Sequence, residues 1–164
     1  MKVRHPLLAL ALAAALSPLQ LAWAGGTHQV SVSASVTGTC VVNTATSTLS
    51  FGALNPGTGG TVNAAWSGGT FRCTNGTTYT VSSNDGLWES ASGGGSNRMK
   101  LSTATDCSTP TNCIRYTFGS AAGGTGSGMT TNISFNVTGT TNLADYQDAA
   151  EGSYADTVTL TVSP

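Results

Sequence analysis

The sequence predicts an all-β protein, an antiparallel β-sandwich of the immunoglobulin kind. Short stretches of alternating apolar and polar residues recur between clusters of Gly, Asn, Ser and Pro, which is typical of strands joined by turns. No stretch keeps apolar residues at the helical period for three turns. Only 8% of the residues are charged, so Ser, Thr, Asn and Gly must cover the surface.

The chain of 164 residues begins with the features of a secretory signal peptide, which we assign to residues 1–24. A basic start precedes an apolar run over residues 7–16, and Ala22-Trp23-Ala24 supplies a small-x-small cleavage pattern. The run is too short to cross a bilayer, and no later run is long enough. A retained N-terminal anchor is the less favoured alternative. We therefore expect an exported chain with no membrane insertion after cleavage.

The charge of the mature chain excludes one class of partner. Four basic residues remain after cleavage, against seven acidic ones. Nucleic-acid binding requires clustered Lys and Arg side chains. We expect no nucleic-acid partner.

The predicted strands follow one another along the mature chain. Alternation predicts extended segments at residues 30–36, 39–42, 49–52, 70–73, 77–81, 98–101, 114–118, 133–137 and 158–162. Asn75-Gly76 supplies the positive backbone angles of a two-residue turn, which predicts a hairpin between residues 70–73 and 77–81. Gly139 is expected to end the strand before it, residues 143–146 to form a short ordered loop, and the Gly-rich segments 93–95 and 123–128 to be exposed, flexible connections.

The four cysteines all follow the signal peptide, and an even number in an exported chain indicates two disulfides. Three pairings are possible. We favour Cys40–Cys73, which joins the first strand to the next core strand, and Cys107–Cys113, which closes a short loop. A metal site is disfavoured, because the cysteines lack the close spacing and the histidines that zinc sites use.

The residues give no support for catalysis. His28 is the one histidine of the mature chain, and no G-x-S-x-G motif presents a serine. Four acidic residues lie close together in the sequence, and a solvated acidic turn explains them better than a pair of catalytic carboxylates: Asp145, Asp148, Glu151 and Asp156. We expect no enzyme activity, catalytic residues, cofactor or metal.

Several motifs occur in an order that resembles a known family. They are the alternating leader into Cys40, Leu49-x-Phe51-Gly52, Cys73 with Gly76-Thr77-x-Tyr79-x-Val81, Asn97-Arg98-Met99, and the terminal Gly152-x-Tyr154-x-Asp156-Thr157 before the last strand. The chain resembles the spore coat protein U domain family, which includes the pilin subunits of archaic (Csu-type) chaperone–usher pili. It departs from the family's usual pattern by ending in Val162-Ser163-Pro164 instead of an aromatic residue.

The resemblance implies a sandwich that lacks its last strand and is completed by donor-strand exchange. Residues 25–38 would be the N-terminal donor extension, in which residues 27–37 donate the strand, and residues 39–164 would form the pilin domain. The inserting side chains would be Val30, Val32, Ala34 and Val36, and the acceptor edge would be Val158, Leu160 and Val162. The partners would be a periplasmic chaperone, an outer-membrane usher and other pilus subunits.

The implied function is an exported structural pilus subunit that passes through the periplasm to the cell surface and supports adhesion and biofilm formation. Two alternatives stay open. The N-terminal stretch has the pattern of a strand that could also fold back onto its own domain. The chain could also be a secreted binding module or tip adhesin that grips sugar or a surface through loops holding Trp66 or Trp88, although Trp in a small sandwich more often packs in the core.

Overall fold

The structure, a computed structural model, describes residues 25–66, 68–88 and 97–164. The chain divides into two units, the first ending at residue 35 and the second formed by residues 36–164. In the first unit, the described residues 25–35 are exposed and contain no helix or strand. The predicted signal peptide and the Gly93–Gly95 loop lie outside the described residues. None of the helices in the described residues has the length and hydropathy of a membrane span.

The second unit is built from antiparallel strands, which confirms the all-β prediction. Its strands are β1 Cys40–Val42, β2 Val62–Trp66, β3 Thr70–Cys73, β4 Thr78–Ser83, β5 Asn97–Leu101, β6 Cys113–Ser120, β7 Gly123–Thr125, β8 Ile133–Ser134, β9 Val137–Thr141, β10 Tyr154–Ala155 and β11 Leu160–Ser163. A 3₁₀ turn, η1 (Pro110–Asn112), and one helical turn, α1 (Leu143–Tyr146), complete the described elements. The ordered turn expected at residues 143–146 is therefore present as α1.

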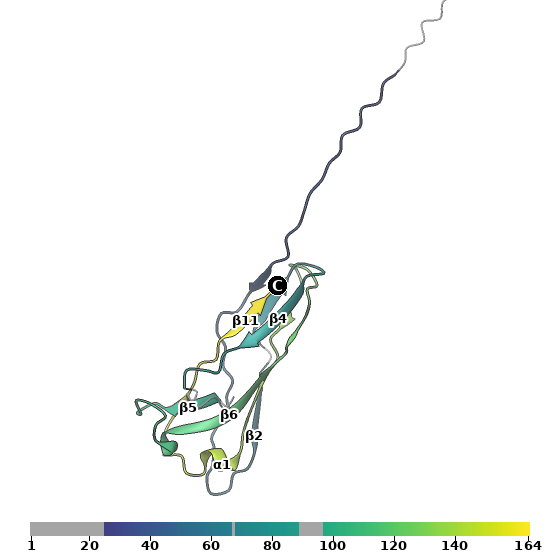
Figure 1. Cartoon of the computed structure of the whole chain (residues 1–164). Coiled ribbons are helices and arrows are strands. Elements are labelled where there is room, and N and C mark those ends of the chain that lie inside the picture. Colours follow the sequence, from purple (N-terminus) through teal and green to yellow (C-terminus); the bar gives the residue numbers. More distant parts are fainter. Residues whose placement is uncertain (1–24, 67, 89–96) are drawn as a thin grey trace, which may run out of the picture. The chain divides into compact units, whose positions relative to one another are not determined.

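The strands form three sheets, with the orders β1-β3-β8, β10-β5-β6-β9-β2 and β11-β4-β7. Among the described strands, β5 with β6 and β9 with β10 are the consecutive pairs that stay in one sheet, and the other consecutive strands, such as β2 and β3 or β10 and β11, lie in different sheets. Strands that switch sheets at a bend or bulge are a feature of packed β-sandwiches. Figure 1 shows β11 beside β4 within this unit.

The predicted hairpin at Asn75-Gly76 is wrong, although the turn itself forms. β3 pairs with β1 and β8, whereas β4 pairs with β11 and β7. Gly76 has φ +77° while Asn75 does not have a positive φ, and the Thr77 amide donates to the Thr74 carbonyl at 3.0 Å. This matches a type II turn, whose twist does not suit a two-residue hairpin. The turn therefore carries the chain from one sheet to another.

The flexible connection predicted at residues 123–128 is also wrong for its first three residues. Instead of a flexible connection, Gly123–Thr125 forms β7, which pairs with β4. A Cβ on Gly123 would lie 2.5 Å from the Tyr79 carbonyl oxygen, and a Cβ on Gly124 would lie 2.7 Å from the Tyr79 hydroxyl. These glycines are needed because the backbone approaches Tyr79 closely.

Three strand boundaries differ from the sequence prediction. Residues 133–137 divide into β8 and the start of β9, because the Phe135 amide donates to the Gly69 carbonyl at 3.0 Å and leaves the ladder. Gly139 does not end this strand, since β9 continues to Thr141. The last strand starts at Leu160, so Val158 lies outside it. β2 was not predicted.

The core is an aromatic cluster closed by the first disulfide. Phe71 packs between Phe135 and Tyr79, with ring centroids 4.8 and 5.0 Å apart respectively. Cys40 and Cys73, which face each other in the β1–β3 ladder, form a disulfide, and Cys107–Cys113 form the other. Both predicted pairings are confirmed. The other members of the cluster are Val81 and the partly buried Trp66, Ile133, Leu160 and Val162.

Candidate functional site

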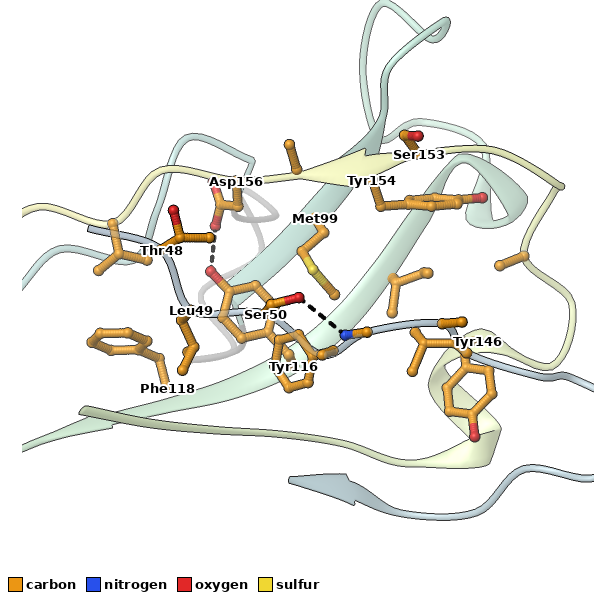
Figure 2. A pocket seen from close by; sticks show the side chains of 18 of the residues that line it. Thr48, Leu49, Ser50, Met99, Tyr116, Phe118, Tyr146, Ser153, Tyr154 and Asp156 are labelled. Atoms are coloured by element: carbon orange, nitrogen blue, oxygen red, sulfur yellow. Dashed lines mark hydrogen bonds between the residues drawn. The ribbon is translucent and has the colours of Figure 1, made fainter. Parts of the chain in front are cut away.

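A cavity of about 870 Å³ lies between two segments of the second unit that are far apart in sequence. One wall is residues 47–54, and the facing wall is residues 149–158 followed by Leu160. We call this cavity the groove. Its remaining lining comes mainly from apolar and aromatic side chains: Pro56, Trp66, Met99, Ile114, Tyr116, Phe118, Val137 and Tyr146. Figure 2 shows Leu49 and Ser50 on one wall, Tyr154 and Asp156 on the other, and Tyr116 and Met99 between them.

The Leu49-x-Phe51-Gly52 element forms the first wall without being a strand, so the strand predicted at residues 49–52 is not present. The Phe51 ring contacts the Tyr116 ring edge-on at 5.6 Å. A Cβ on Gly139 would lie 2.7 Å from Phe51 and 3.0 Å from Leu49, so the missing side chain of Gly139 lets both residues pack over β9. Gly52 then turns the chain with φ +70°.

The backbone of the first wall and of a short stretch of the second wall is available for pairing. Among the described residues, neither residues 44–54 nor residues 156–158 make a backbone–backbone hydrogen bond. β10 pairs with β5 on one side and is an edge strand on the other, and β1 and β11 are edge strands of their own sheets. Unpaired backbone groups beside an apolar surface are a ready template for another strand.

The terminal motif builds the second wall, since Gly152, Tyr154, Asp156 and Thr157 all line the groove. Gly152 has φ +149°, and a Cβ there would lie 2.5 Å from Leu101. The Tyr154 hydroxyl lies 2.7 Å from the carbonyl oxygen of Ala150. The motif therefore fixes the bend by which the chain enters β10.

Asp156 connects this wall to the floor of the groove and to a neighbouring loop. Its carboxylate accepts hydrogen bonds from the Tyr116 hydroxyl at 2.6 Å and from the Leu87 amide at 2.8 Å. Burial raises the pKa of the Tyr116 phenol, and the Asp156 carboxylate raises this pKa further. The phenol therefore stays protonated and donates. Sequence reasoning missed Tyr116, because a single Tyr in a strand, 40 positions from Asp156, gives no signal of its partner.

We expect Asp156→Ala to lower the free energy of unfolding by about 3 kcal/mol, because Tyr116 is only 5% exposed and its hydroxyl would lose its partner. Urea denaturation of the purified protein would measure the loss. Asp148→Ala removes an exposed carboxylate and should change stability by no more than about 0.5 kcal/mol. Equal stability of both variants would contradict a structural role for Asp156.

The structure separates the predicted acceptor residues. Val158 and Leu160 line the groove, whereas Val162 does not line it; Leu160 and Val162 both pack against the aromatic core cluster. β1 and β11 approach within 8 Å between Cα atoms. A strand inserted between two others requires about 9.6 Å, twice the usual strand spacing. The groove is thus open along residues 47–54 and narrow where β1 meets β11.

The predicted donor side chains are exposed and apolar, with exposed fractions of 74% for Val30, 91% for Val32 and 85% for Val36. Ala34 is also exposed. Of the two tryptophans considered for ligand binding, Trp66 packs against the core. The Lys100 ammonium lies 4.6 Å from the centre of the Trp88 ring.

Comparison with known proteins gives a family match over most of the chain. The model of the Spore Coat Protein U domain matches residues 26–161. Among solved structures, the chain is similar to one in the CsuC–CsuE chaperone–tip adhesion subunit pre-assembly complex from archaic chaperone–usher Csu pili of Acinetobacter baumannii. The identity is 24% and the TM-score 0.43, over 77% of this chain and 40% of that chain, so this chain spans less than half of its length. No curated protein matches.

Proposed function

Since the chain belongs to the Spore Coat Protein U domain family, we propose that it is an exported structural subunit of a chaperone–usher pilus that polymerises by donor-strand complementation. The groove supports this proposal best. It combines many apolar and aromatic lining side chains with two wall segments, residues 47–54 and 156–158, that make no backbone–backbone hydrogen bond among the described residues. Strand addition uses both features, because backbone hydrogen bonds provide affinity and alternate side chains fill the apolar surface.

The donor would be residues 27–37 of another copy, with Val30, Val32, Ala34 and Val36 facing the groove and the intervening serines facing water. The exposed valines need such a site, because three of them lie within seven residues and each is at least 74% exposed. Burying three valines contributes about 5–9 kcal/mol before the cost of ordering the strand. The eight residues of the first wall span at most about 29 Å when extended, which accommodates the seven residues from Val30 to Val36.

The acceptor would be residues 47–54 on one side and residues 154–160 on the other, which includes Val158 and Leu160 of the predicted edge. A donor reaching Val162 would have to separate β1 from β11. Before assembly, a periplasmic chaperone would cover the groove, since an open apolar edge is an aggregation hazard. An outer-membrane usher would then exchange the chaperone for the next subunit, and the surface pilus would support adhesion and biofilm formation.

A denaturing gel of material sheared from the cell surface tests the proposal directly. Run without heating, donor-strand polymers should give a ladder of regular steps, and boiling should collapse it to one band, because strand release is slow until the fold melts. A single monomer band in both lanes, from cells that express the protein, would contradict polymerisation. That outcome would favour a strand folded back in the same chain, or a binding module acting through the Leu87-Trp88 loop, where Leu87 is 63% exposed.

A further inference from the structure

Hydrogen bonds fix the chain at the point where it enters the second unit. The Thr39 amide donates to the Thr74 hydroxyl oxygen at 3.1 Å, and the Thr74 amide donates to the Thr39 carbonyl at 2.9 Å. The Thr74 hydroxyl lies 3.3 Å from that same carbonyl and can donate to it. We call residues 37–39 together with Thr74 and Thr77 the anchor. The Thr74 side chain therefore contacts both the amide and the carbonyl of Thr39.

Close packing adds to these hydrogen bonds. A Cβ on Gly38 would lie 2.8 Å from the Thr77 hydroxyl oxygen, so the backbone at Gly38 runs directly against the turn. Cys40 follows at once and is bound to Cys73 by the disulfide. The Thr74 hydroxyl also lies 3.5 Å from the Thr37 carbonyl oxygen, so hydrogen bonds, packing and a covalent bond hold the chain from Thr37 onward.

The anchor begins immediately after the last donor side chain. Val36 is the fourth apolar residue of the alternating stretch, and Thr37 is the next residue. Flexible linkers between domains need several Gly- or Ser-rich residues to let the domains reorient. A strand donated up to Val36 leaves no such residues between the groove of one copy and the anchor of the next.

We propose that the anchor is a stiff joint, by which a second copy that binds the strand is held in direct contact with the surface around the Thr74–Thr77 turn. This inference rests on the proposed function. The exposed residues available for that contact are Asn75 and Gly76 of the turn and residues 37–39 of the anchor. Thr74 is then a positioning residue, which sets the angle between consecutive subunits without touching the groove.

Filaments of variants test the joint. Thr74→Val keeps the shape of the side chain but removes its hydroxyl, and insertion of Gly-Ser-Gly-Ser between Val36 and Thr37 supplies a linker while keeping every domain residue. Both should still give the unheated ladder, but the persistence length of their filaments in electron micrographs should fall by about twofold or more. Thr74→Ser, which keeps the hydroxyl, should match the wild type. Filaments as stiff as the wild type in both variants would overturn the inference.

Hydrogen exchange separates this inference from the proposed function, because it needs no polymer. In the purified protein, the Thr39 amide should exchange about tenfold faster in Thr74→Val than in the wild type, since one hydrogen bond is lost. An unchanged exchange rate of the Thr39 amide would contradict the hydrogen bond on which the anchor depends. If the Thr39 amide exchanges faster in Thr74→Val as expected, but the wild-type chain gives no ladder, the result would overturn polymerisation and with it the joint. The anchor would then stand as a feature of the fold.

Discussion

Fusing residues 27–37 behind Pro164 should raise the thermal midpoint of the domain by about 15 °C. The variant would carry the strand after a short Gly- and Asn-rich linker and would lack residues 25–35, so that it remains monomeric. The fused strand can enter the groove beside residues 154–160, where it buries three valines and pairs with both walls. A net gain of about 5 kcal/mol corresponds to this shift in a domain of this size.

A control separates groove filling from a general effect of the added tail. The same fusion with Ser in place of Val30, Val32 and Val36 keeps the length and the backbone donors but removes the apolar side chains. Calorimetry should show a midpoint close to that of the unfused domain. Equal stabilisation by both tails would mean that the groove does not select apolar side chains at alternate positions.

Local sequence predicted the parts of the fold that depend on local pattern. β3 and β5 coincide closely with the alternating stretches, and the disulfides follow from the positions of Cys40 and Cys73 in neighbouring strands and from the short Cys107–Cys113 loop. Alternation reports which face of a segment is apolar. It does not report whether a neighbouring strand exists to pair with it. Residues 49–52 therefore have a strand pattern but form an unpaired wall.

Other features of the fold depend on tertiary contacts, which the local sequence pattern does not reveal. The Asn75-Gly76 dipeptide is compatible with several turn types, and the sheet partners of β3 and β4 select one that separates them. Gly123 and Gly124 suggest flexibility, yet they are glycines because Tyr79 leaves no space for a side chain. The hydrogen bond from the Tyr116 hydroxyl to the Asp156 carboxylate joins two residues that are brought together only by the fold of the whole sandwich. The predicted terminal motif was informative because its residues line the groove together.

Val32→Asp should abolish polymerisation while leaving the complex of the monomer with its chaperone intact. Val32 lies near the middle of the alternating stretch, and in the donated strand its side chain would face the apolar lining of the groove. Placing a carboxylate there without a partner costs about 4 kcal/mol or more, which lowers the binding constant about a thousandfold. The unheated ladder should disappear, and the chaperone complex should still be recovered from the periplasm.

Ser31→Asp is the matched control, because it adds the same charge one residue away. Successive side chains of a strand point to opposite faces, so Asp at position 31 would face water and the ladder should persist. Loss of the ladder in both variants would indicate a general effect of charge on the extension. Loss of the chaperone complex in Val32→Asp would contradict the donor assignment, because a residue that acts only on another subunit's groove is not needed for its own domain to bind the chaperone. If Val32→Asp loses the ladder and Ser31→Asp keeps it, alternate side chains of the extension must enter an apolar groove. This result would distinguish strand insertion from association of surfaces.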